Sequence, residues 1–271
     1  MSISSAAFAM VLSGTAMGAP SPMSPVLTPD KTWSLDLGLA HDRSTLLLDL
    51  DTTRTGQTTV APAGWTPPFL TARRAFTPIS ELTLGSDGLG LRFRLLDRRD
   101  SALPLTATLG GALSVAFEPT NEPVPAPSAT LQVGGEWSVG SGVAVRPYLQ
   151  GQYKGAEAIY FSVTDLQTGA SGSGAWTSTP ALDGFLLEPR AHVAAAIDLP
   201  IDTGGPLVVP GVGIDLPFST GPGILDLTAC STCAVGIDSV ATQSGPTVFF
   251  TLRFESSGRR RAAKEATGSD Q

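Results

Sequence analysis

The segment Leu105–Phe117 reads LTATLGGALSVAF, and it alternates apolar residues with small or polar ones over its whole length. Such period-two alternation is typical of a β-strand with one face in an apolar environment. Strands in globular proteins usually contain only about five or six residues, so this one is long. The segment therefore predicts a sheet protein with long, one-sided strands.

Nine further segments alternate in the same way. The 271 residues include 30 Gly and 22 Pro, a composition that favours strands and turns over helices. No run of about 18 apolar residues occurs, so no transmembrane helix is predicted. We expect about ten strands, at Trp33–Leu39, Leu46–Leu50, Leu82–Leu84, Leu89–Leu95, Leu105–Phe117, Leu131–Val139, Val143–Tyr153, Phe185–Leu199, Val208–Phe218 and Val248–Phe254.

Charge and motif content exclude several classes of function. The formal net charge of −7 argues against a nucleic-acid-binding protein, which needs a basic face. Apolar residues make up 42% of the chain, too many for a wholly disordered protein. The sequence contains no glycine-rich phosphate loop, no cluster of metal ligands and no nucleophile elbow. We therefore predict no nucleic-acid partner, no cofactor, no metal and no enzymatic activity.

The second face of the predicted strands bears on the fold. Alternation alone fits a soluble β-sandwich as well as a membrane β-barrel, because both have one apolar face per strand. The other face here mixes very small residues with charges of both signs, as a narrow barrel interior requires. The predicted polar network of the lumen consists of Arg92, Arg94, Glu136, Arg146, Glu188, Arg190 and His192.

The connections between the predicted strands alternate between long and short. Residues 118–127, 155–184 and 219–245 form long connections, whereas 97–102, 140–142 and 200–206 form short ones. Outer-membrane barrels have short periplasmic turns and longer extracellular loops. In this topology the connection 52–77 is periplasmic, although its length could hide a further strand pair. Eight or twelve strands therefore also fit the sequence.

Aromatic residues gather at both ends of the predicted strands, on the apolar face. Rings in these positions would form the two girdles that outer-membrane barrels place at the membrane–water interfaces. The expected girdle residues are Phe117, Tyr153, Phe185 and Phe218 at the outer end, and Trp33, Phe93, Trp137 and Phe254 at the periplasmic end. The girdles favour a single antiparallel up-and-down β-barrel over the sandwich.

Two segments resemble those of small bacterial outer-membrane β-barrel proteins. The segment Val143–Tyr153, which contains Pro147-Tyr148, is similar to a strand common in that family, and Val248–Phe254 is similar to its C-terminal assembly signal. The resemblance implies an integral barrel that contacts outer-membrane lipid and is folded by the barrel-assembly machinery. The family signal normally ends the chain, whereas here residues 255–271 follow it.

The predicted organisation has four parts. Residues 1–19 resemble a signal peptide without a basic start, which fits a clipped signal or a disordered leader. Residues 20–31 are predicted to be a proline-rich linker, 32–254 the barrel, and 255–271 a disordered polar tail. Export agrees with a disulfide between Cys230 and Cys233, since no helix follows them as a redox motif would require.

His192 also allows a catalytic hypothesis. Barrel-embedded lipid hydrolases use a Ser, a His and an acid, a role that His192 could fill with Glu188 and either Ser114 or Ser138. Strand parity instead places His192 in the lumen, which favours a polar-network role. We expect an outer-membrane barrel of structural or small-solute-transport type with a narrow, charge-paired lumen. The alternative is a secreted or periplasmic β-sandwich that acts as a binding or adhesion module.

Overall fold

The structure is a computed structural model, and every regular element in its described residues is a β-strand. None of these residues belongs to a helix that is long and apolar enough to cross a membrane. The described residues are 24–28, 32–41, 45–51, 57–62, 68–97, 104–117, 123–139, 144–163, 166–169, 176–179, 182–202, 206–227, 236–243 and 245–256.

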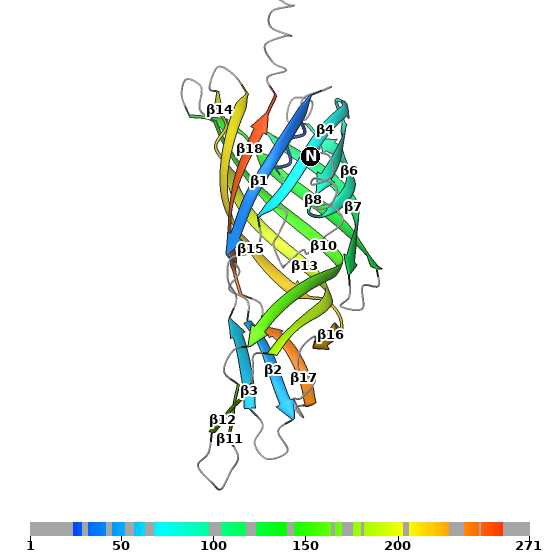
Figure 1. Cartoon of the computed structure of the whole chain (residues 1–271). Coiled ribbons are helices and arrows are strands. Elements are labelled where there is room, and N and C mark those ends of the chain that lie inside the picture. The colour runs from blue at the N-terminus through cyan, green and yellow to red at the C-terminus, as the bar shows by residue number, and fades with distance from the viewer. Residues whose placement is uncertain are drawn as a thin grey trace, which may run out of the picture.

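The main body is a closed barrel of ten antiparallel strands (Figure 1). These are β1 (Trp33–His41), β4 (Phe69–Thr77), β5 (Ser80–Gly85), β6 (Gly88–Leu96), β7 (Leu105–Phe117), β8 (Pro123–Gly135), β10 (Ala144–Val163), β13 (Leu182–Asp198), β15 (Leu207–Ser219) and β18 (Thr247–Glu255). Successive barrel strands are neighbours, and the ring closes because β18 pairs with both β15 and β1. The predicted all-β, up-and-down barrel of about ten strands is confirmed.

A second group of strands lies beyond one end of the barrel. There β2 (Thr45–Asp51), β3 (Gln57–Pro62) and β17 (Gly236–Gln243) form a three-stranded sheet in the order β17-β2-β3 (Figure 1). The hairpin β11 (Leu166–Gly169) and β12 (Trp176–Thr179) lies farther out. Together with residues 158–163 of β10 and 182–187 of β13, these strands are called the β-extension. Short strands β9 (Trp137–Ser138), β14 (Ile201–Asp202) and β16 (Ile224–Leu227) pair with β10, β15 and β13.

The connections differ in length between the two ends of the barrel. The end that carries the β-extension, here the extension end, has the three long connections 42–68, 164–181 and 220–246, and also the short connections 86–87 and 118–122. The opposite end, here the turn end, has the connections 78–79, 97–104, 136–143 and 199–206. This asymmetry is the one that outer-membrane barrels show.

Three details of the predicted strand order are wrong. Leu46–Leu50 is not a barrel strand but lies in β2 of the β-extension. The barrel strand β4 lies within 52–77, where the sequence allowed a further strand pair but did not locate it. The connection 52–77 contains β3 and β4, so it leaves the extension end rather than the end with the short turns. β10 and β13 also run into the connection predicted at 155–184.

The strand β8 begins earlier than predicted, within the stretch expected to be a loop. It includes Pro123, Pro125 and Pro127, which pair in register with β7. The pairing of β8 with β10 ends at Ser128 and Lys154, so this part of β8 has a neighbour on one side only. Proline, which has no N–H to donate, is tolerated at such an edge.

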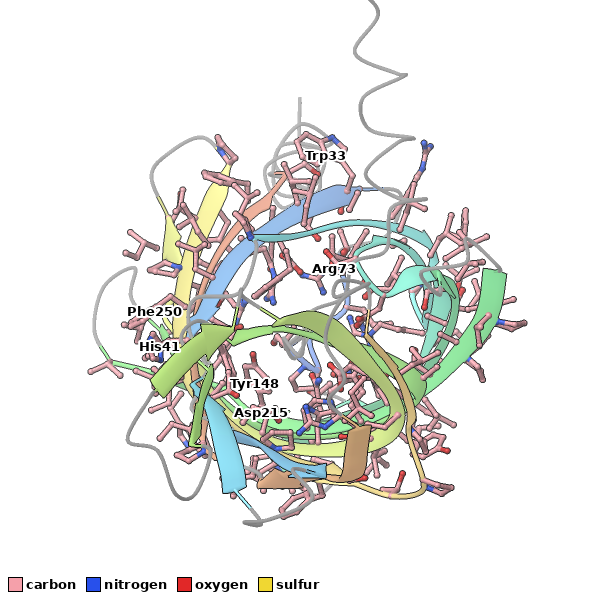
Figure 2. The ribbon with its side chains drawn as sticks, turned by 60° about the horizontal axis from the view of Figure 1, so that its bottom comes forward. Trp33, His41, Arg73, Tyr148, Asp215 and Phe250 are labelled. Atoms are coloured by element: carbon pink, nitrogen blue, oxygen red, sulfur yellow. The ribbon has the colours of Figure 1, made fainter. Side chains whose placement is uncertain are left out.

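The two faces of the barrel wall have opposite character. Leu109, Leu131, Leu149 and Ile214 are exposed on the outside, whereas the alternate positions are buried in the lumen. Figure 2 shows Trp33 and Phe250 outside the ring of strands, with Arg73, Tyr148 and Asp215 inside it. Alternation thus sorts an apolar exterior from a largely polar interior, as in a barrel surrounded by lipid.

Candidate functional site

The lumen near the turn end is filled by a group of six charged residues, the Arg253 cluster. Arg253 lies 2.7 Å from Oδ1 of Asp36 and 3.3 Å from Oδ2 of Asp198, through Nε and Nη1. Arg73 bridges Asp36 and Glu81, at 3.0 and 3.5 Å. Arg92 forms an ion pair with Glu81. All six side chains are almost fully buried, and each guanidinium group lies beside at least one carboxylate, as buried ions require. Arg253 also lies 3.7 Å from Oε1 of Glu255.

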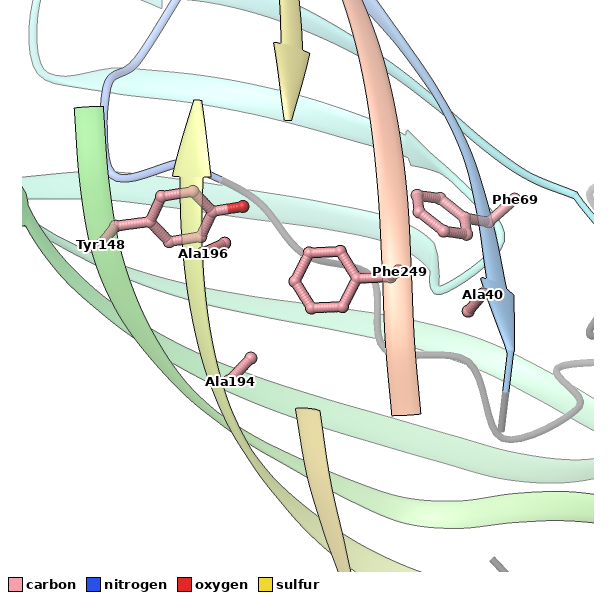
Figure 3. Close-up of a cluster of buried hydrophobic side chains, with 6 residues drawn as sticks. All are labelled: Ala40, Phe69, Tyr148, Ala194, Ala196 and Phe249. Carbon is pink, nitrogen blue, oxygen red and sulfur yellow. The ribbon is translucent and has the colours of Figure 1, made fainter. Parts of the chain in front are cut away.

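An apolar layer follows the Arg253 cluster along the lumen. It consists of Ala40, Phe69, Tyr148, Ala194, Ala196 and Phe249, which converge from five strands (Figure 3). Gly38 makes space for this layer, because a Cβ built there would lie 1.8 Å from Cζ of Phe69. Along β13 the layer separates the two charged regions, because Ala196 and Ala194 lie between Asp198 and His192. Elsewhere in the lumen Arg92 and Asp87 line the same small cavity, so polar side chains of the two regions meet there.

The His192 cluster fills the lumen on the other side of the apolar layer. Nδ1 of His192 lies 2.7 Å from Oδ2 of Asp215, and Nε2 lies 2.8 Å from Oε2 of Glu157. Lys154 joins Glu157 and Asp87 at 3.4 and 3.3 Å. The cluster comprises Asp87, Lys154, Glu157, Glu188, Arg190, His192 and Asp215.

The geometry around His192 does not form a hydrolytic site. Both ring nitrogens are engaged by Glu157 and Asp215 rather than by Glu188, and the side chain is only 1% exposed. The hydroxyl of Ser114 donates to the carbonyl of Ala126, and the side chain of Ser138 lies outside the described residues. Among the described residues no group of His, Cys, Asp and Glu could hold a metal ion.

The predicted lumen residues separate into different pairs. Arg92 and Arg146 contact Glu81 and Glu136, the latter at 2.8 Å. Arg94 instead pairs with Asp97 near the turn end. The remaining three belong to the His192 cluster, where Arg190 lies 3.2 Å from Glu188. Eight other charged residues of the two clusters were not in the predicted network: Asp36, Arg73, Glu81, Lys154, Glu157, Asp198, Asp215 and Arg253. Four of them lie on the lumen side of predicted strands, so strand parity alone could have identified them: Asp36, Asp198, Asp215 and Arg253.

The segment Ser24–Thr28 also lies inside the barrel, although it belongs to the stretch interpreted as a linker. The carbonyl of Ser24 accepts a 2.7 Å hydrogen bond from Nη2 of Arg92. At the other end, the N–H of Thr28 donates to Oε2 of Glu81 at 2.8 Å, and its hydroxyl lies 3.2 Å from that of Ser34. Ser24, Leu27 and Thr28 are buried. The chain therefore fills part of its own lumen.

Little space remains between these groups. A cavity of about 10 Å³ lies among Asp87, Arg92, Thr130, Gln152 and the residues around them. That is room for about one water molecule. The cavity is too small for a substrate, and polar side chains such as Asp87, Arg92 and Gln152 line it together with glycine and alanine residues.

The aromatic side chains of the exterior lie where lipid-facing girdles are expected. Trp33, Phe93 and Trp137 are about half exposed toward the turn end, as are Tyr153 and Phe218 toward the extension end. A closed barrel with an apolar exterior leaves no backbone group unpaired toward lipid. The chain folds as an outer-membrane β-barrel.

The remaining predicted girdle residues, the cysteines and the two chain ends are only partly covered by the described residues. Phe254 is half-buried, and the side chains of Phe117 and Phe185 lie outside the described residues. Cys230 and Cys233, with the predicted signal peptide at 1–19, also lie outside them. The predicted tail begins one residue early, because Glu255 ends β18; residues 257–271 are not among those described.

No family model and no curated protein matches this chain. Solved structures that resemble it include the outer membrane protease OmpT of Escherichia coli, with 8% identity and a TM-score of 0.37 over 85% of this chain and 98% of that one. The attachment invasion locus protein Ail of Yersinia pestis has 10% identity and a TM-score of 0.26, over 83% and 98% of the two chains. The β domain of the Bordetella autotransporter BrkA has 10% identity and a TM-score of 0.25, with the same coverages. The fold assignment therefore rests on strand pairing and on the apolar exterior of the barrel.

Proposed function

We propose that this outer-membrane barrel is a closed anchor, which holds the β-extension at the outer face of the membrane and does not conduct solutes. The observation that carries the proposal is the filling of the lumen by two charged clusters and an apolar layer, with a cavity of only about 10 Å³ where the clusters meet. An open diffusion pore instead needs a continuous aqueous path.

The apolar layer closes part of the lumen, and buried polar side chains such as Gln150 and Gln152 fill the space beside it. Phe249 and Phe69 are 0% and 4% exposed, and their rings lie among Ala40, Ala194 and Ala196. An ion that passed between these rings would lose its hydration shell, and within the layer only the Tyr148 hydroxyl could partly replace it. Apolar constrictions close channels in this way.

The β-extension supports the second half of the proposal. β10 and β13 remain paired up to Val163 and Leu182, well beyond the last pairing of β8 with β10. The long connections gather at the same end, which is the extracellular end in barrels of this kind. We infer that the barrel supports a surface structure.

Conductance measurements test whether the lumen is closed. The purified full chain, folded in detergent and checked by its heat-dependent shift on electrophoresis, is added to a planar bilayer in potassium chloride. We expect no stable conductance steps, whereas a general porin measured in parallel gives them. Stable steps from the folded protein would support the small-solute-transport role and contradict the closed anchor.

Epitope tags test the orientation. One tag is inserted between β11 and β12, and a matched tag is inserted between Asp97 and Pro104 at the turn end. Antibody should label intact cells only when the tag lies between β11 and β12. Labelling of the turn-end tag alone would reverse the proposed orientation.

A further inference from the structure

We propose that the turn end of the lumen is a binding site for an extended, uncharged peptide, and that this chain occupies the site with its own residues 24–28. The site goes beyond the closed anchor, because it assigns a ligand class to one part of the lumen. Its main groups are Arg92 and Glu81, which the ion pair holds next to each other.

The two charged groups of the wall recognise the main chain of the segment. Arg92 donates from Nη2 to the carbonyl of Ser24, and Glu81 accepts from the N–H of Thr28. Both side chains are at most 1% exposed, so these charge-assisted hydrogen bonds form away from bulk water. Because the bonds involve backbone groups, another extended peptide could supply the same carbonyl and the same N–H.

The surroundings of the segment's side chains favour uncharged residues. Pro25 and Leu27 are buried, and Leu27 is only 3% exposed. The barrel wall has a glycine, Gly134, where Pro25 lies. A Cβ built on Gly134 would come within 2.9 Å of Cγ of Pro25, so a larger wall residue would collide with the segment. A charged residue at position 27 would lose its hydration without a partner.

The wall also holds a polar group that the segment does not use. Gln132 accepts hydrogen bonds through Oε1 from Arg92 and Thr108, at 3.2 and 2.6 Å. Within the described part of the chain, its buried Nε2 has no hydrogen-bond partner. This N–H group, beside the Arg92 that binds Ser24, can donate to a further ligand carbonyl or to a water.

Peptide binding in trans tests the proposal. A variant that lacks residues 21–28 is folded in detergent, checked by its heat-dependent shift, and titrated with a fluorescent peptide of residues 22–29 with blocked ends. We expect saturable binding to this variant, and at least about tenfold weaker binding to the intact protein, whose site is already occupied.

Changes in the peptide leave the barrel untouched and so serve as matched controls. The substitution T28P removes the N–H that donates to Glu81, together with the hydroxyl that lies beside Ser34, but keeps the peptide uncharged, so it separates site binding from partition into micelles. It should weaken binding about tenfold or more, the value of a hydrogen bond to a charged group. The substitution S24A keeps the carbonyl and should change binding by less than about twofold. Equal binding of the T28P and parent peptides, or no binding to the folded variant, would overturn the proposal.

A cross-link tests the same placement in the full-length chain, and it decides the question if the deletion variant does not fold. The hydroxyls of Thr28 and Ser34 lie 3.2 Å apart, so the pair T28C and S34C, in a background with C230S and C233S, should form a disulfide on mild oxidation. The cross-linked protein should no longer bind the peptide. Failure of the folded protein to cross-link would place the segment outside the lumen. Conductance of the wild-type protein would contradict the closed anchor without affecting these results.

Discussion

The contact between Gly38 and Phe69 gives a quantitative prediction about the apolar layer. In G38A the new Cβ would lie 1.8, 2.3 and 2.4 Å from three ring atoms of Phe69, which must therefore move. Phe69 is only 4% exposed, so the ring has little space to move into. We expect G38A to destabilise the barrel by about 1–3 kcal/mol, the usual cost of overpacking.

A double-mutant cycle isolates this contact. F69A removes the ring and should cost about 3–5 kcal/mol by itself. In the double variant G38A/F69A the added methyl group enters the space that the ring has left. The penalty for G38A should therefore disappear, which gives a coupling energy of about 1–3 kcal/mol between the two positions.

Reversible urea unfolding in phospholipid vesicles, followed by tryptophan fluorescence, measures these free energies. G151A is the matched control, because Gly151 is also in a barrel strand but a Cβ there would meet nothing within 4 Å. It should change the free energy of unfolding by less than about 0.5 kcal/mol. If the effects of G38A and F69A simply add within about 0.5 kcal/mol, Phe69 does not point across Gly38 and the apolar layer is misplaced.

Three further substitutions test the wall and the two charged clusters by the same unfolding assay. E81A leaves two buried guanidinium groups without their shared carboxylate and should cost about 3–5 kcal/mol of unfolding free energy. The control T83A, two residues further along the same face of β5, should cost about 1 kcal/mol. Equal losses for the two variants would refute the role of the ion pairs. L149R places a charge on the outer, lipid-facing side of β10 and should cost about 2–4 kcal/mol of unfolding free energy. V139R lies at the turn end and should cost only about 0–1 kcal/mol. The reverse order would contradict a lipid-facing exterior. H192A removes the group between two buried carboxylates and should cost about 3 kcal/mol or more, so a neutral result would show that the cluster is not closed as described.

Strand parity predicted much of the barrel because lipid and lumen impose opposite demands on alternate residues. Its failure at β4 has a clear cause. The lumen side of that strand includes Phe69 with Arg73, and the outer side includes Arg74 with Leu70, so neither face is uniformly apolar. β2 shows the complementary error, because TLLLDLD alternates as a barrel strand would but pairs with β3 and β17.

The charge pairs needed information that the sequence does not hold. Glu81 meets Arg73 and Arg92, which come from the two neighbouring strands, so the pairing depends on strand register. Lys154 and Glu157 both point into the lumen although they are three positions apart, which in a regular strand would place them on opposite faces. The register shift of β10 between these two residues explains this, and parity alone cannot locate such a bulge.

The number of strands and the filling of the lumen are linked. A barrel of about eight strands is just wide enough for its own side chains to fill, so ten strands leave additional space. Near the turn end the wall of this barrel offers small inward residues such as Thr83, Thr108 and Gly134. There the Arg253 cluster and residues 24–28 occupy the additional space together. At the apolar layer Phe69, Tyr148 and Phe249 fill the space, and Pro25 of the segment lies close to Tyr148 beside Gly134. The chain thus closes a wide barrel by different means at successive levels, and a single substitution at one level should leave the others closed.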